Sequence, residues 1–127
     1  MSYFKRLLIA GSRDFVDYEY FKQCCEEYLE NLPEFEVEYF FILSGGARGT
    51  DTMAEKISHE WGFPFKKYPA NWNTNGKFDK LAGRKRNKVM AENCDMALIF
   101  WDGKSTGTQN MIQHLTNLDI QYKIEYI

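Results

Sequence analysis

The sequence contains few of the residues that build disulfide frameworks, metal centres or membrane spans. It has three cysteines, none of them in a Cys-x-x-Cys pair, and two histidines. An odd number of cysteines without that spacing argues against disulfides and against a structural zinc site. The longest apolar run, 96–101, has six residues, whereas a membrane helix needs about 20. The N-terminal apolar run is too short for a secretion signal. We therefore expect a cytoplasmic protein without a metal ion or a membrane anchor.

The charge of the chain is nearly balanced. The 16 Lys and Arg residues and 18 Asp and Glu residues give a net charge of −2. The field of the whole molecule therefore does not attract nucleic acid, and we do not expect nucleic acid as a partner. Hydrophobic residues make up 44% of the chain and aromatic residues 17%, which is enough to form a core. The length fits one domain, 1–127.

Apolar runs alternate with stretches of helical periodicity along the chain. We expect strands at 5–10, 40–43, 63–68, 96–101 and 122–127, helices at 20–32, 51–61, 80–93 and 108–118, and a loop at 69–77. The spacing of Thr52 and Glu55 predicts a capping box at the start of the second helix. Strict alternation of strands and helices is typical of an α/β domain with a mainly parallel sheet.

The five strands differ in charge, which predicts their order. The first, second and fourth are apolar runs, so they are expected at the centre of the sheet. The third carries Lys66 and Lys67, and the fifth carries Lys123 and Glu125, as expected for edge strands. With right-handed crossovers the order is 3-2-1-4-5, a Rossmann-like, three-layer α/β domain. Ligands bind such sheets beyond the carboxyl ends of the strands, near the switch point between strands one and four.

Three polar, glycine-bearing loops follow strands at this edge. Glycine lets the backbone approach a ligand closely, and the helix N-termini that follow two of the loops favour an anion. A simpler alternative is that the glycines only make tight turns and that Thr50 or Asp51 caps a helix. Three such loops at one edge favour an anionic ligand. The candidate ligand-binding residues in them are Gly11, Ser12, Arg13, Ser44, Gly45, Gly46, Arg48, Gly49, Thr50, Asp51, Gly103, Ser105, Gly107 and Thr108.

A basic stretch covers the start of the third predicted helix. We interpret most of its charges, Lys77, Lys80, Lys85, Arg86 and Lys88 among them, as a solvated face. Arg84 and Asn87 are three residues apart, so both are expected to point into the ligand site. Trp72, in the preceding loop, either stacks on a base or covers the core; the sequence leaves both open.

Several segments, taken in order, resemble one known family. They are 11–15 (GSRDF), 43–55 (LSGGARGTDTMAE), 69–72 (PANW), 83–91 (GRKRNKVMA) and 100–108 (FWDGKSTGT). Over nearly its whole length the chain resembles the YspA-type, YpsA-related branch of the SLOG superfamily. The resemblance implies a Rossmann-like fold. It also implies binding of a nucleotide or nucleotide-derived ligand, related to NAD or ADP-ribose, as a sensor or ligand-binding module with no further cofactor required.

The enzymes of this superfamily are phosphoribohydrolases with a PGGxGTxxE motif, which the resemblance places at 102–111. With one residue more than the motif between its glycines, the segment matches at Gly103, Gly107 and Thr108, but Asp102 stands in place of the proline and Met111 in place of the glutamate. Glycosidic cleavage needs a carboxylate to activate water or to stabilise the reacting centre, which methionine cannot do. We therefore lean toward a binding module. If the chain hydrolyses an N-glycosidic or phosphoester bond, the candidate catalytic residues are Asp51, Asp102 and Arg84.

A further alternative comes from another superfamily member, the DNA-uptake protein DprA. In this alternative the basic helix binds single-stranded DNA, and binding would weaken steeply with salt. A homo-oligomer is also left open, because nothing in the sequence identifies a contact face.

Overall fold

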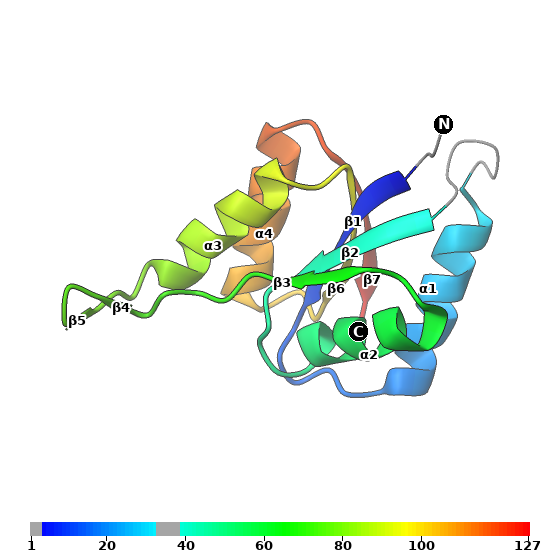
Figure 1. Ribbon diagram of the computed structural model, residues 1–127, viewed down its shortest axis with the longest axis horizontal. Helices are drawn as coiled ribbons and strands as arrows, with labels where there is room; N and C mark the ends of the chain where they lie inside the picture. The colour runs from blue at the N-terminus through cyan, green and yellow to red at the C-terminus, as the bar shows by residue number, and fades with distance from the viewer. Residues whose placement is uncertain (1–3, 33–38) are drawn as a thin grey trace.

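The core of the protein is a five-stranded parallel sheet in the order β3-β2-β1-β6-β7. The computed structural model describes residues 4–32 and 39–127. The predicted Rossmann-like fold and strand order are confirmed, with β6 and β7 as the fourth and fifth predicted strands (Figure 1). The elements are β1 (Phe4–Gly11), α1 (Tyr18–Glu30), β2 (Tyr39–Ser44), α2 (Thr50–Trp61), β3 (Phe65–Lys67), β4 (Asn73–Thr74), β5 (Lys77–Phe78), α3 (Ala82–Glu92), β6 (Met96–Trp101), α4 (Thr106–Asn117) and β7 (Gln121–Tyr126).

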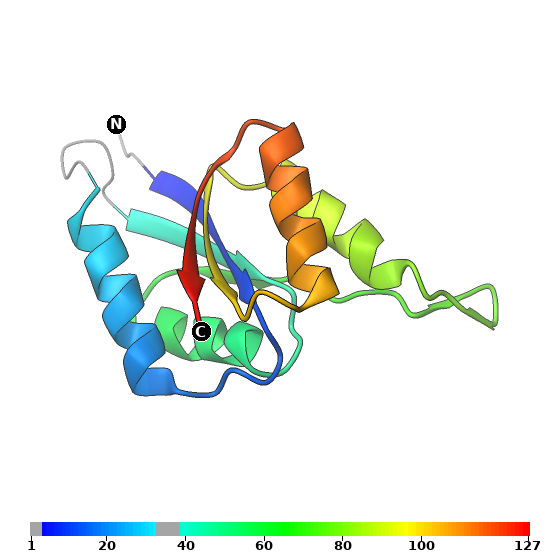
Figure 2. The same cartoon turned by 180° about the vertical axis from the view of Figure 1, so that it is seen from behind.

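Helices cover both faces of the sheet. Figure 1 and the reverse view in Figure 2 show α1 and α2 on one face and α3 and α4 on the other. Side chains alternate between the faces of a strand, so Leu7 and Ile9 of β1 pack toward α1 and α2, while Leu8 and Ala10 pack toward α3 and α4. This is why the central strand is apolar at consecutive positions. The three cysteines are free and buried.

The start of α2 differs from the prediction. The helix begins at Thr50 with Gly49 as N-cap and no side-chain cap, so the capping box predicted from Thr52 and Glu55 is wrong. The Thr52 hydroxyl donates to the carbonyl of Ala47 (3.2 Å), and Glu55 pairs with a lysine of β3 (3.4 Å). The other ends of the elements differ from prediction by a few residues, as helix ends commonly do.

The predicted loop at 69–77 contains a small hairpin, formed by β4 and β5. Its turn is Asn75-Gly76, and both residues have positive φ, 54° and 76°, the conformation that favours Asn-Gly in two-residue hairpins. The hairpin extends away from the body of the domain (Figure 1). At its base Trp72 and Phe78 stack nearly parallel, with ring centroids 6.0 Å apart.

Among the helices described by the structure, none has the length and apolar character needed to cross a membrane.

Candidate functional site

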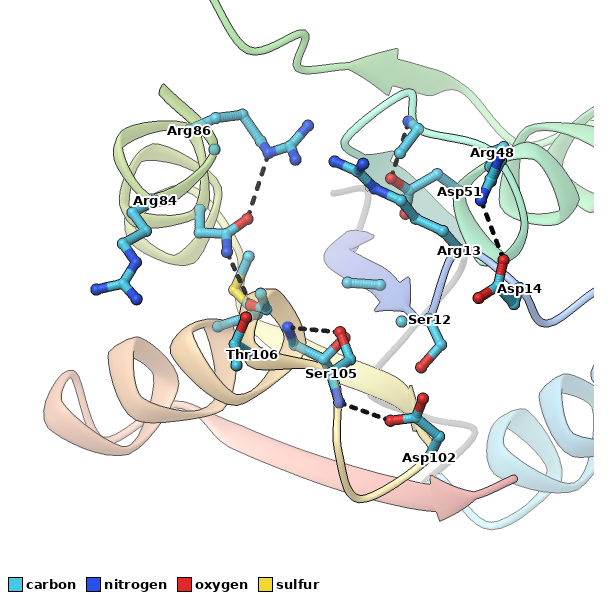
Figure 3. Close-up of a pocket in the computed structure, with 18 of the residues that line it drawn as sticks. Ser12, Arg13, Asp14, Arg48, Asp51, Arg84, Arg86, Asp102, Ser105 and Thr106 are labelled. Atoms are coloured by element: carbon cyan, nitrogen blue, oxygen red, sulfur yellow. Dashed lines mark hydrogen bonds and ion pairs between the residues drawn. The ribbon is translucent and has the colours of Figure 1, made fainter. Parts of the chain in front are cut away.

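A cavity of about 620 Å³ lies at the carboxyl edge of the sheet, between the loop after β1, the start of α3 and the loop before α4 (Figure 3). A second hollow of about 450 Å³ adjoins it and shares five of its lining residues. Eleven of the predicted ligand residues line the first cavity: Gly11, Ser12, Arg13, Arg48, Asp51, Trp72, Arg84, Asn87, Ser105, Gly107 and Thr108. The candidate catalytic residue Asp102 lines it as well. Gly45 and Gly46 line the second.

The remaining predicted residues, Ser44, Gly49, Thr50 and Gly103, line neither hollow. Ser44 and Thr50 are fully buried, and both use their hydroxyls inside the protein. The Thr50 hydroxyl donates to the carbonyl of Ser12 (3.0 Å), and the Ser44 hydroxyl lies 2.6 Å from the carbonyl oxygen of Ile9 and 2.8 Å from the Asp51 carboxylate. These groups therefore shape the loops that carry the other residues.

Asp51, in the first turn of α2, is buried and holds the loop that precedes the helix. Its Oδ1 bonds the Ser44 hydroxyl and its Oδ2 accepts the backbone N–H of Ala47 (3.0 Å). Burial raises the pKa of this carboxyl, while the two hydrogen bonds and the charges of Arg86 and Arg13 oppose the rise. Because its oxygens are bonded within the protein and it is 8% exposed, Asp51 is built to hold the loop.

Arg86 is the residue that sequence reasoning missed. The sequence predicts a solvated side chain for Arg86, but its Nη1 donates to the carbonyls of Gly45 (2.7 Å) and Tyr68 (3.2 Å), and its Nε donates to Asn87 (3.3 Å). The guanidinium thus links α3 to the loop before α2. Figure 3 shows it pointing toward Arg13 and Asp51, whereas Arg84 leaves the same helix in another direction.

The spacing of residues along α3 indicates that Arg86 lies on the buried face of the helix. Ala82 and Met90, four residues before and after it, are both buried, and residues four apart lie on the same helix face. Arg86 therefore occupies the middle of a buried stripe. Asn87 also points inward, as predicted, and its amide donates to the carbonyl of Gly107 and to Asn110 (both 3.1 Å).

The glycines of the two helix-leading loops serve different purposes. A Cβ on Gly49, where φ is +74°, would collide with the backbone of Arg13, and one on Gly45 would collide with the Arg86 guanidinium. A Cβ on Gly107, in the first turn of α4, would meet nothing within 4 Å. The loop before α2 therefore needs glycine for its own packing, while the Gly107 position opens toward the cavity.

The N-terminus of α4 is organised to leave backbone donors free. Ser105 caps it by accepting the N–H of Thr108, and Asp102 Oδ1 accepts the N–H groups of Lys104 (2.8 Å) and Ser105 (2.7 Å), which lowers the pKa of that carboxyl. The backbone N–H groups of Thr106 and Gly107 have no hydrogen-bond partner within residues 4–32 and 39–127. No acidic residue occurs in the first turn.

Ser12 adds a second free polar group to the wall. Its side chain is 5% exposed, and its hydroxyl has no hydrogen-bond partner among the residues that the structure describes. Leaving a buried hydroxyl unpaired costs about 1–3 kcal/mol. The cavity wall therefore contains a group that a ligand oxygen or a water molecule would satisfy.

The lining of the cavity is predominantly basic. It contains six basic and three acidic side chains: Arg13, Arg48, Lys80, Arg84, Arg86 and Lys104 against Asp14, Asp51 and Asp102. Arg48 pairs with Asp14 (3.1 Å), but both are highly exposed at the rim, where an ion pair contributes little to stability. Met111 is buried and also lines the wall. An anionic ligand fits this balance of charge.

Comparison with known proteins identifies a structural relative of the fold. No protein-family model matches the chain, and no curated protein matches its sequence. Among solved structures, the chain is similar to the DNA processing protein A, DprA, of Streptococcus pneumoniae, with a TM-score of 0.72 and 17% sequence identity. The match covers 95% of this chain and 50% of that chain. At this identity the similarity establishes the fold alone.

Proposed function

We propose that this protein binds a phosphorylated, nucleotide-derived ligand in the 620 Å³ cavity and acts as a sensor or ligand-binding module, as expected for the YspA-type branch of the SLOG superfamily. The open N-terminus of α4 carries this proposal. Two unpartnered N–H groups at a helix N-terminus, with the positive end of the helix dipole behind them, favour a phosphate. The basic side chains around the cavity add to that attraction.

The phosphate sits against Thr106 and Gly107, with Arg13 and Arg84 neutralising its charge. Ser12, whose hydroxyl lacks a partner among the described residues, takes a sugar or phosphate oxygen. Trp72 is 37% exposed and packs over Gly83 rather than in the core, which supports stacking on a base. The ligand class that combines these features is a nucleotide or a nucleotide derivative such as ADP-ribose.

Binding without turnover is favoured by the state of the candidate carboxylates. Asp51 has both oxygens bonded within the protein, and Asp102 holds the turn before α4. The position of the motif glutamate is the buried Met111. None of these side chains is arranged as a free general base.

The test is a thermal-shift panel with NAD, ADP-ribose, AMP and cyclic nucleotides, with each mixture analysed afterwards for products. A ligand at 100 times its Kd stabilises the fold by about 2.7 kcal/mol, and we expect it to be recovered intact. Gly107→Ala is the matched variant. The fold has room for the added methyl group, but that group would occupy the space of a phosphate bound at the backbone N–H groups. The variant should melt like the wild type and lose the ligand shift.

Three outcomes would overturn the proposal. The absence of a shift with every nucleotide class would exclude the ligand, and conversion of the ligand would make the protein a hydrolase. A wild-type shift that Gly107→Ala leaves unchanged would place the ligand elsewhere.

A second candidate function is single-stranded DNA binding along α3 and the hairpin. The observation that favours it is the exposed Trp72–Phe78 stack beside the basic start of α3, because bases stack on such aromatic side chains. The fold similarity to DprA adds only weak support. Titration of a labelled oligonucleotide should show affinity that falls steeply with salt and falls again in Phe78→Ala. Salt-insensitive or undetectable binding would remove this candidate.

A further inference from the structure

The two edges of the sheet are protected very differently against pairing with another strand. β3, at one edge, has three residues and carries Lys66 and Lys67 side by side. A second copy of β3 would bring positive charges together, so this edge repels itself. β7, at the other edge, has six residues without proline, Gln121–Tyr126. Within the described parts of the chain, its only sheet partner is β6.

The outward backbone groups of β7 can be identified from its pairing with β6. The N–H of Ile127 donates to the carbonyl of Trp101 in β6. Because successive residues of a strand direct their N–H groups to opposite sides, Tyr122, Ile124 and Tyr126 direct theirs away from β6. Among residues 4–32 and 39–127 these outward donors and acceptors have no strand partner, as is typical of an exposed edge strand.

The side chains of β7 are arranged symmetrically about Ile124. In the order 122–126 they read Tyr-Lys-Ile-Glu-Tyr. An antiparallel copy centred on Ile124 places each Tyr122 opposite a Tyr126, and each Lys123 opposite a Glu125. The opposite charges would then face each other across the axis, and opposite charges directly across a strand pair are stabilising.

The symmetric register also agrees with the backbone. In the register centred on Ile124, Tyr122 of one copy faces Tyr126 of the other, and the two Ile124 residues face each other. All of these residues direct their backbone groups outward, so each facing pair can exchange both backbone hydrogen bonds. The Lys123–Glu125 pairs then fall at the positions without hydrogen bonds, where side chains on opposite strands approach most closely. Within one chain these two side chains already lie together, 2.9 Å apart.

We propose that a second copy of this chain docks on β7, antiparallel and across a two-fold axis through Ile124, which joins two sheets into one continuous sheet. The self-complementary charges of Lys123 and Glu125 select this partner. The two-fold axis makes the contact isologous and closed, so the assembly stops at a dimer. The other edge stays unpaired because its lysines repel.

Charge variants test the dimer. In Lys123→Glu every facing pair becomes negative, and in Glu125→Lys every facing pair becomes positive. We expect each variant alone to dimerise more weakly than the wild type, by on the order of tenfold. A mixture of the two variants restores complementarity, and so does the double exchange Lys123→Glu with Glu125→Lys within one chain. Light scattering coupled to size exclusion distinguishes a dimer from the 15.0 kDa monomer.

The expected result is a wild-type dimer, single variants that dimerise more weakly, and recovery of the wild-type dimer stability in the mixture. Recovery on mixing also shows that the single variants are folded. A wild type that stays monomeric across the micromolar range would overturn the proposal. So would a dimer whose stability neither single variant changes, since its contact would lie on another face.

Discussion

Two loops at the site lead into helices: 44–49 before α2 and 102–105 before α4. They look alike in sequence, but they differ in whether protein groups already use their backbone donors. Asp51, in the first turn of α2, accepts the N–H of Ala47 in the loop before that helix and offsets the helix dipole. The first turn of α4 has no acidic residue and leaves the N–H groups of Thr106 and Gly107 without a partner among the described residues. In the loop before α2, protein groups already use the backbone donor and the space beside the glycine. At the start of α4, the donors and the space are available to a ligand.

This difference shows that glycine content alone does not identify an anion site. What matters is whether the backbone donors and the space beside the glycines are already used. At Gly45 the space is taken by Arg86, whereas at Gly107 it is open. Substitutions that break each loop separately should therefore have separable effects on stability and on binding.

The largest effect is expected from Arg86→Met. The substitution leaves the carbonyls of Gly45 and Tyr68 without their donor and removes a positive charge beside Asp51. We expect a loss of roughly 2–4 kcal/mol in the free energy of unfolding, measured by urea denaturation. Arg84→Met is the matched control on the same helix, and its exposed side chain predicts a change within about 0.5 kcal/mol. Equal losses in the two variants would contradict the role of Arg86.

The next largest effect is expected from Gly49→Ala. The methyl group would collide with the Arg13 backbone, and alanine disfavours a φ of +74°, so the variant should lose roughly 1–3 kcal/mol. Gly107→Ala should be neutral or slightly stabilising, because alanine is the better helix former. Parallel thermal melts of the two variants measure the contrast. Similar melting temperatures would show that the two glycines are equivalent after all.

Ser105→Ala tests the side-chain cap of α4. It removes the side-chain cap of α4, which typically costs about 1 kcal/mol. The loop before α2 has no such cap, so Thr52→Ala is expected to change stability less. Denaturant midpoints of the two variants would rank them. A larger loss from Thr52→Ala would reverse the expected difference between the helices.

The smallest effect is the pH dependence contributed by Asp51. Burial raises its pKa in the folded protein, so the folded state retains a proton that the unfolded chain releases. Its contribution to stability is therefore complete below the unfolded pKa, about 4, and is lost as the pH rises through the folded value. Asp51→Asn should remove this decline from a plot of stability against pH. An unchanged slope in the variant would assign the decline to other groups.

The sequence predicts the fold well because the relevant signals are local. Apolar strand runs and the lysines of β3 are enough to order the sheet. The loop before α2 is harder to predict, because its hydrogen bonds join residues far apart in the chain. Arg86 reaches Gly45 across 41 positions, and basic residues on a helix are usually solvated. The hairpin turn Asn75-Gly76 is a local signal, so the predicted loop at 69–77 is wrong for a reason that the sequence itself contains.

A titration of the isotope-labelled protein with AMP or ADP-ribose, followed through its backbone amide resonances, distinguishes a ligand at the N-terminus of α4 from one at the loop before α2. We expect the amide resonances of Thr106 and Gly107 to shift with ligand concentration, while that of Ala47, whose N–H is already bonded to Asp51, stays in place. A shift at Ala47 with Thr106 and Gly107 unmoved would contradict this expectation, because the ligand would then occupy the loop that the protein has filled.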